Sequence, residues 1–403
     1  MFGKRLERTA LVSTPWICAA LICGCVGADS VQEHANSTRI CSYEAVMQTA
    51  EDGEPGTLLC DLPFSSPQIS GNGTRIFYVS EDEKGRREAV SAAVIVPDGK
   101  PPVGGWPIIA WAHGTVGIAK GCAPSQRPNL FFEEYADAVN AFAQAGYLVV
   151  ASDYEGLGAS GFHKYLQLAT ESRNVVDAVA AARALVPEAG ENWVTVGHSQ
   201  GGHAALGVGE LSPDRMDAKH YLGTVAFAPA ANLDQAPEIL ASYAPSDGYD
   251  LLMFVASAIE RIYPDFRPSD LLAPELVEYL PKAQSACDDE LIEDLMRFPQ
   301  LEHALAEHWA DNSAIADFLA TNEPVQLRNA APILLLQGSN DQLVPAVSSQ
   351  IVRERACALG STIGYREYSG ESHDSVLVAG MTDALQWIAE RFAGRDASAD
   401  CTP

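Results

Sequence analysis

Residues 193–211 constrain the fold more than any other segment of the chain. The apolar run 193–196 is typical of a buried strand, Gly197-His198-Ser199-Gln200-Gly201 follows it, and 201–211 has the composition of a helix. A strand that turns sharply into a helix through G-x-S-x-G exposes its serine at the turn, beside a helix N-terminus that favours negative charge. The segment therefore predicts Ser199 as a nucleophile.

Two later segments supply the partners that a serine nucleophile needs. An apolar run at 332–336 leads into Gln337-Gly338-Ser339-Asn340-Asp341, and His373 is the only histidine downstream of Asp341. The order Ser, Asp, His along the chain matches the α/β-hydrolase arrangement. We predict that Ser199, Asp341 and His373 form a catalytic triad. Asp374, adjacent to the histidine, is the rival for the acid.

The oxyanion hole is expected from two backbone amides. The first belongs to Gln200, directly after the predicted nucleophile. The second is expected in the loop after strand 107–111, where Ala112-His113-Gly114-Thr115 follows, and Thr115 is the candidate. We interpret His113 as a residue that shapes this loop.

The rest of the chain alternates between strand and helix patterns, which predicts an α/β fold with a mostly parallel, doubly wound sheet. Expected strands lie at 75–79, 89–96, 107–112, 147–152, 193–196, 222–228, 332–336 and near Tyr365. Expected helices lie at 131–145, 170–185 with Thr170 as the N-cap, 201–211, 347–359 and 374–392.

The alternation stops between 230 and 325, which is helix-rich and is interpreted as a helical cap or lid inserted into the sheet domain. We expect this cap to cover Ser199, and the candidates for its acyl-binding surface are Leu251, Leu252, Phe254, Val255 and Ile259. The α/β-hydrolase core then consists of 29–229 and 326–403. Its first 45 residues, 29–73, are rich in turn formers without a sustained period and are expected to form an N-terminal arm.

The first 28 residues resemble an export signal. Basic residues precede a largely apolar stretch at 9–22, which is too short to span a bilayer. Two ways of processing this signal are open: signal peptidase could cleave after Ala28, or Cys25 could be lipidated and become the new N-terminus. No later stretch reaches the roughly 18 uninterrupted apolar residues of a transmembrane helix.

Charge and cysteine content narrow the class further. A formal net charge of −27 disfavours nucleic acids and anionic membranes as partners. Six cysteines follow residue 28, an even number that an oxidising compartment would pair, in any of 15 connectivities. None has zinc-site spacing, so neither a metal nor a cofactor is expected.

A family resemblance rests on four features. They are His113-Gly114-Thr115, Asp153-Tyr154-Glu155-Gly156-Leu157-Gly158, the elbow with its extra Gly202, and the helical insertion. We interpret Asp153 and Glu155 as structural first and substrate-lining second. The set is similar to the secretory lipase family, typified by yeast lipase A enzymes. The resemblance implies an α/β-hydrolase core, a lid-bearing cap, cofactor-free hydrolysis of acylglycerols or simpler esters, and a bridge between Cys122 and Cys287.

The expected function is that of a secreted or envelope-anchored carboxylic-ester hydrolase acting through an acyl-enzyme on Ser199. Two alternatives stay open. An acyltransferase would use the same triad with an alcohol as acceptor, and a binding protein would use the hydrolase fold without catalysis. Nothing in the sequence indicates a peptide-binding subdomain.

Overall fold

The computed structural model describes residues 41, 43–159, 161–211, 215 and 220–401. The predicted signal peptide, with Cys25 and Ala28, lies outside these residues. Within the described ranges, no helix combines the length and apolar character needed to cross a membrane.

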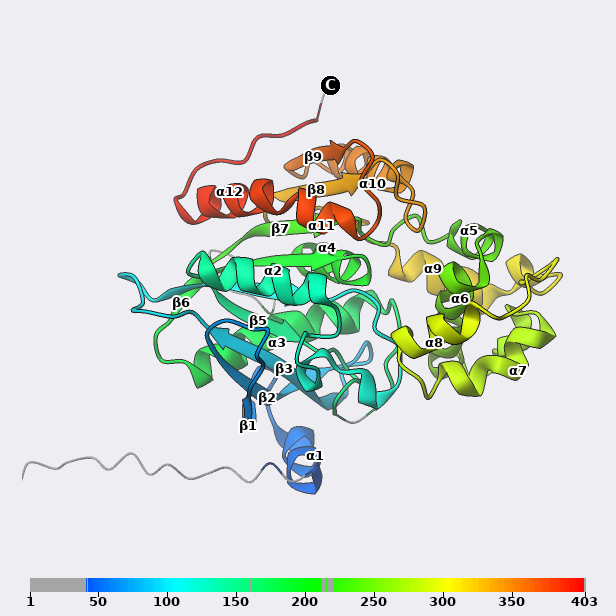
Figure 1. Ribbon diagram of the computed structural model, residues 1–403, viewed down its shortest axis with the longest axis horizontal. Helices are drawn as coiled ribbons and strands as arrows, with labels where there is room; N and C mark the ends of the chain where they lie inside the picture. The colour runs from blue at the N-terminus through cyan, green and yellow to red at the C-terminus, as the bar shows by residue number, and fades with distance from the viewer. Residues whose placement is uncertain (1–40, 42, 160, 212–214, 216–219, 402–403) are drawn as a thin grey trace, which may run out of the picture. The chain divides into compact units, whose positions relative to one another are not determined.

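The described strands form one nine-stranded sheet in the order β1-β2-β3-β5-β4-β6-β7-β8-β9. The pairs β1–β2, β2–β3 and β3–β5 are antiparallel, and the other five pairs are parallel. This confirms the predicted mostly parallel α/β architecture (Figure 1). The strands are β1 (Leu58–Phe64), β2 (Asn72–Glu81), β3 (Arg87–Val96), β4 (Trp106–Ala112), β5 (Leu148–Ser152), β6 (Ala189–His198), β7 (Tyr221–Phe227), β8 (Ile333–Gly338) and β9 (Ile363–Tyr368).

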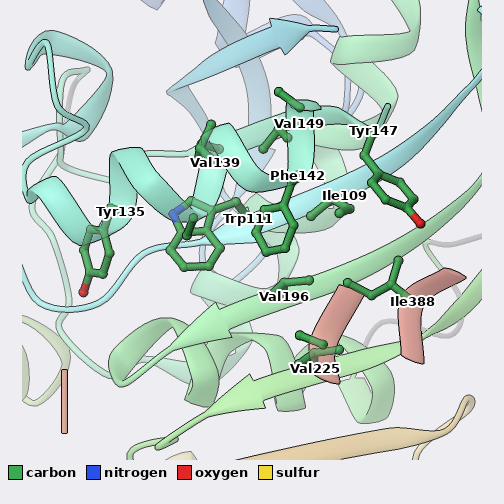
Figure 2. Close-up of a cluster of buried hydrophobic side chains, with 14 of the residues drawn as sticks. Ile109, Trp111, Tyr135, Val139, Phe142, Tyr147, Val149, Val196, Val225 and Ile388 are labelled. Atoms are coloured by element: carbon green, nitrogen blue, oxygen red, sulfur yellow. The ribbon is translucent and has the colours of Figure 1, made fainter. Parts of the chain in front are cut away.

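Helices cover both faces of the sheet because the central strands are apolar on both sides. On one face, α2 (Glu133–Gln144), α11 (Ser375–Ala379) and α12 (Met381–Phe392) pack on one set of alternate strand residues. Figure 2 shows Phe142 and Ile388 meeting Val196 and Val225 there. On the other face lie α3 (Leu168–Leu185), α4 (Gln200–Leu211) and α10 (Ala346–Ala358).

Between β7 and β8 the chain leaves the sheet and forms helices with an apolar core of their own (Figure 1). Phe254 and Ile259, which the sequence offered as acyl-binding candidates, lie in this core. The helices of the insertion are α5 (Ala236–Ser242), α6 (Pro245–Ile262), α7 (Pro274–Ala283), α8 (Asp288–Leu295) and α9 (Ser313–Asn322).

Three disulfides connect the six described cysteines. Cys122 pairs with Cys287 and so ties the loop after β4 to the insertion, which confirms the pairing that the family resemblance implied. The other bridges are Cys41–Cys60 and Cys357–Cys401.

The segment 29–73, expected as an N-terminal arm clamped by local pairing, contains α1 (Tyr43–Asp52) and β1 in its described part. The sequence predicted neither element, because pairing with β2 and the Cys41–Cys60 bridge stabilise structure that local sequence does not specify. Two other local predictions were wrong. Gln167, rather than Thr170, caps α3, since its side chain accepts from the Thr170 amide at 2.9 Å. The last helix breaks into α11 and α12 at Gly380, a weak helix former.

Candidate active site

Ser199 stands at the turn between β6 and α4 in a backbone conformation that side chains rarely adopt, with φ of +56°. The backbone amide of Ser199 donates to the backbone oxygen of Phe227 at 2.9 Å, and the backbone oxygen of Ser199 accepts from the amide of Ala230. The end of β7 and the residues after it therefore hold the turn in place. Gly201 is required for close approach, because a Cβ there would lie 1.9 Å from the Ala112 oxygen. The elbow thus has the geometry that its sequence indicated.

His373 and Asp341 are brought together from the loops after β9 and β8. Nδ1–H of His373 donates to Oδ2 of Asp341 at 2.8 Å. The other carboxylate oxygen accepts from the amides of Leu343 and Val344 at 3.0 and 2.8 Å, so the acid is fixed by its own loop. The rival Asp374 is exposed.

The remaining nitrogen of His373 is available for a reaction. With the proton of a neutral ring on Nδ1, Nε2 carries the lone pair. This atom is buried and has no hydrogen-bond partner among the described residues. His373 and Ser199 line the same cavity.

The loop after β4 lies against the elbow. A Cβ on Gly114 would meet the Tyr135 hydroxyl at 2.2 Å and Cβ of Ser199 at 3.3 Å, so only glycine permits this approach. The Gly114 amide donates to the Tyr135 hydroxyl at 3.1 Å. No hydrogen bond engages the amides of Thr115 and Gln200 in the part of the chain that the structure describes. Of these two residues, Thr115 also lines the cavity around Ser199.

Sequence reasoning missed a hydrogen-bonded chain that crosses the site. The Tyr135 hydroxyl lies 3.2 Å from Nδ1 of His198, and Nε2 of His198 lies 2.9 Å from the His373 backbone oxygen. Burial and the nearby His373 lower the pKa of His198 to about 4, which keeps its ring neutral. Burial raises the pKa of Tyr135, which stays a phenol. Only the place of His198 inside the elbow could have signalled this role.

A cavity of about 930 Å³, lined by both polar and apolar residues, includes Ser199 and His373 in its lining and is called the acidic cavity below. Every charged residue that lines it in the described chain is acidic. These acidic residues are Glu134, Asp247, Asp250, Asp288 and Asp374. Three of them, Asp247, Asp250 and Asp288, belong to the insertion, which also contributes Leu251 and others to the lining.

A narrower apolar cavity of about 60 Å³ also reaches Ser199. Leu251, Leu252 and Val255 of α6 line it, together with residues that follow β7 and β8. Three of the five apolar side chains proposed from sequence as an acyl-binding surface therefore lie beside Ser199.

Two buried carboxyl groups of the acidic cavity, those of Asp250 and Asp288, lie close together. Burial raises the pKa of Asp250 to about 6 and raises that of Asp288 well above its ordinary value, the latter also through the charge of Asp250. The Asp288 amide donates to the Val116 oxygen at 3.1 Å, beside the Cys122–Cys287 bridge. This pair therefore sits where the insertion joins the loop after β4.

Among the described residues, one group of side chains has metal-ligand spacing: atoms of His198, His373 and Asp374 lie within 4.8 Å of one another. Both ring nitrogens of His198 already lie at hydrogen-bond distance from Tyr135 and from the His373 backbone. The group therefore fits a hydrogen-bonded arrangement better than a metal centre.

The residues interpreted as structural have structural contacts. His113 Nδ1 lies 2.7 Å from its neighbour's oxygen within the loop. Asp153 accepts from the Ser125 amide at 2.8 Å and from the Ser91 hydroxyl at 2.5 Å. Glu155 pairs with Lys164 at 3.2 Å.

Similar proteins share both the fold and stretches of sequence. The structure resembles that of Candida antarctica lipase A in its closed state, with a TM-score of 0.74, 18% identity, and 88% of this chain and 86% of that one covered. It also resembles the rice cell wall degrading esterase LipA from Xanthomonas oryzae, with a TM-score of 0.66, 19% identity, and coverage of 84% and 98%.

Two sequence relatives are lipases. Lipase A of Arthroderma benhamiae is 22% identical over 383 residues, covering 87% of this chain and 79% of that protein. Lipase 6 of Candida albicans is 26% identical over 286 residues, covering 64% and 58%. The model of the family described as "Secretory lipase" matches residues 136–400, which include the elbow, the insertion, Asp341 and His373. The chain therefore belongs to the secretory lipase family of α/β-hydrolases.

Proposed function

We propose that the protein is an exported carboxylic-ester hydrolase in which Ser199, His373 and Asp341 carry out acyl transfer to water. The observation that carries the proposal is the buried, unpartnered Nε2 of His373, whose ring is oriented by Asp341 and which shares a cavity with Ser199. A base in this position can take the hydroxyl proton of a serine nucleophile.

The steps follow from this geometry. Oγ of Ser199 attacks the ester carbonyl carbon while its proton passes to Nε2 of His373. The amides of Gln200 and Thr115 donate to the oxygen that becomes negative. The C–O bond to the alcohol breaks as His373 returns the proton to the leaving oxygen, and the acyl group remains on the serine. Water then repeats the sequence and releases the acid.

Asp341 stabilises the imidazolium that forms at each transfer. Its carboxylate is also hydrogen-bonded by the Leu343 and Val344 amides and by Nε2 of Gln337 at 2.9 Å. Together with the His373 ring, these donors fix the orientation of the carboxylate. The acid therefore holds the Nδ1–H tautomer of His373.

We further propose that residues 230–325 act as a cap that supplies the acyl-binding surface. An acyl chain gains about 0.8 kcal/mol for each methylene that leaves water. The apolar cavity lined by Leu251, Leu252 and Val255 offers such burial beside Ser199, and the carboxyl groups of the acidic cavity can hydrogen-bond to the alcohol part of an ester.

The test is a panel of p-nitrophenyl esters of increasing acyl length, assayed with the wild type, Ser199→Ala and Ser285→Ala. Ser285 is an exposed serine of the insertion that bonds to the Pro281 oxygen, so its variant controls for loss of a hydroxyl. We expect Ser199→Ala to lose roughly 10⁴- to 10⁶-fold in kcat while its circular dichroism stays unchanged. Near-normal turnover by folded Ser199→Ala would refute the mechanism.

The same assay separates the alternatives. An acyltransferase would form a new ester when an alcohol such as butanol is added, at the expense of free acid. A binding protein would turn over none of the esters, and Ser199→Ala would match the wild type.

Membership of the secretory lipase family and three disulfides indicate export. We propose processing either after Ala28 or before Cys25. The intact mass of the mature protein distinguishes the two, since lipidation adds acyl chains to a new N-terminal cysteine.

A further inference from the structure

A buried polar cluster surrounds the side chain of Gln200, which the mechanism above does not use. Nε2 of Gln200 lies 2.6 Å from Oε1 of Glu171 and 2.8 Å from Nε2 of His163. The same Glu171 oxygen accepts from the Leu166 amide at 3.0 Å. Glu171, His163 and Gln200 are each at least 95% buried. The side chain of the first oxyanion donor is thus held inside the protein.

The chemistry of the partners determines how the Gln200 amide is oriented. Nδ1 of His163 lies 3.1 Å from the Glu155 backbone oxygen, which can only accept, so Nδ1 carries the proton. Burial lowers the pKa of His163 to about 3, so its ring stays neutral and Nε2 is an acceptor. The two N–H groups of Gln200 therefore donate to His163 and to Glu171.

The second carboxylate oxygen of Glu171 faces a histidine on the nucleophile helix. Nδ1 of His203 lies 3.4 Å from Oε2 of Glu171, and neither atom makes a hydrogen bond among the described residues. Nε2 of His203 donates to the Asn322 backbone oxygen at 2.7 Å, so in the neutral ring Nδ1 carries the lone pair.

We propose that Glu171 is a positioning residue that holds Gln200 through its side chain, and thereby orients the Gln200 amide that binds the oxyanion. The inference rests on the proposed function and extends it to a residue of α3. Glu171 receives hydrogen bonds from the loop before α3 and from Gln200, while it faces His203 one turn further along α4. It therefore links α3 to the first turn of the nucleophile helix.

Small displacements of an oxyanion donor have large effects on rate. Gln200 is the first residue of α4, so its amide points out of the helix N-terminus and no intrahelical bond restrains it. Loss of one donor costs about 10²–10³ in kcat, and a shift of about 1 Å can cost 10². The side chain and the backbone amide nitrogen of Gln200 are attached to the same Cα, so hydrogen bonds that hold the side chain also restrain the position of the amide.

The role is one of hydrogen bonding, and a neutral mimic is available. In Glu171→Gln the amide oxygen can accept from Leu166 and Gln200, and the new NH₂ group can donate to Nδ1 of His203. Glu171→Leu keeps the size of the side chain and removes every one of these bonds. Glu210→Leu is the matched control, because Glu210 is also buried and accepts from the Val325 and Leu327 amides, away from Gln200.

The experiment measures kcat and KM on p-nitrophenyl butyrate, inhibition by an alkyl trifluoromethyl ketone, and the unfolding midpoint for each variant. The ketone forms a tetrahedral oxyanion on the serine and so reports the hole directly. We expect Glu171→Leu to lose roughly 10- to 100-fold in kcat and in ketone affinity with little change in KM. Glu171→Gln should stay within about threefold of the wild type on each measure. Glu210→Leu should lower the midpoint alone.

Wild-type kcat in folded Glu171→Leu, or a tenfold loss in Glu171→Gln, would overturn the inference. Should Glu171→Leu fail to fold, Gln200→Leu cuts the same link from the other end and is expected to show the same loss. If Ser199→Ala is inactive while these variants are normal, only the positioning role fails. If Ser199→Ala is active, the proposed function fails first.

Discussion

Nε2 of His198 lies 2.9 Å from the backbone oxygen of His373, so a residue of the elbow supports the loop that carries the proposed base. The opposite nitrogen of His198 accepts from Tyr135, which itself accepts from the Gly114 amide. The oxyanion loop, the elbow and the base are therefore connected by hydrogen bonds between buried groups.

Tyr135→Phe tests this connection. The substitution leaves the Gly114 amide and Nδ1 of His198 buried without their partner, at a cost of about 1–3 kcal/mol each. We expect a lower free energy of unfolding in urea and a fall of roughly tenfold in kcat/KM. Tyr147→Phe is the control, since Tyr147 packs on the same face of the sheet beside Phe392. Equal effects of the two substitutions would contradict the role of Tyr135.

Asp341→Asn should reduce kcat by roughly 10⁴-fold, because an amide can donate to Nδ1 of His373 and stabilise the wrong tautomer. Asp374→Asn changes an exposed side chain and should leave kcat within a few fold. The pair of variants is compared by steady-state kinetics on one short-chain ester. If Asp374→Asn lost most of its kcat while Asp341→Asn lost little, Asp374 and not Asp341 would be the acid of the triad.

Asp288→Asn should stabilise the protein at neutral pH. Folding raises the pKa of Asp288 well above its ordinary value. It also raises the pKa of Asp250, to about 6. The folded protein therefore binds more protons than the unfolded chain, and its stability falls as the pH rises from about 4, the ordinary value of the unfolded carboxyl.

An asparagine removes one of the two charges, so the variant should lose less stability than the wild type between pH 4 and 7. We expect a difference of roughly 1–3 kcal/mol at pH 7 that vanishes near pH 4, since each pKa increase of one corresponds to about 1.4 kcal/mol. Urea unfolding at both pH values measures it, with Asp289→Asn as the exposed control. A wild type that gains stability from pH 4 to 7 relative to Asp288→Asn would reverse the sign.

Removal of the Cys122–Cys287 bridge by a double substitution to alanine should lower the free energy of unfolding by about 2–5 kcal/mol. It should also alter KM for long-chain esters, because the bridge ties the insertion to the loop that carries Thr115. The control is the Cys357–Cys401 double variant, which lacks a bridge between α10 and the C-terminal segment. If both variants change KM equally, the bridge has no specific effect on the cap.

Much of the architecture could be predicted because its signals are local. Buried parallel strands are short apolar runs, as in β4 and β5, and the elbow needs glycines at fixed spacing around Ser199. Asp341 and His373 could be proposed as the acid and the base because each follows a strand and the chain order of such triads is known. The family resemblance added the Cys122–Cys287 pairing.

Local signals failed where long-range contacts decide the structure. The edge strand β1 forms because β2 and Cys41 are beside it, although its own residues carry no clear alternation. Gln167 caps α3 with a side chain that propensity ranks below Thr170. In both places the tertiary partner outweighs a weak local preference.

The sequence by itself determined which chemistry the chain can carry, since a serine in an elbow, an acid and a histidine in order are recognisable one segment at a time. Only the tertiary structure decided how these groups are held. Tyr135 lies 63 residues from His198, and Glu171 lies 29 residues from Gln200, so no local pattern links either pair. They meet because both faces of one sheet are covered by helices, and because a buried polar group must find its partner wherever the fold brings one within reach.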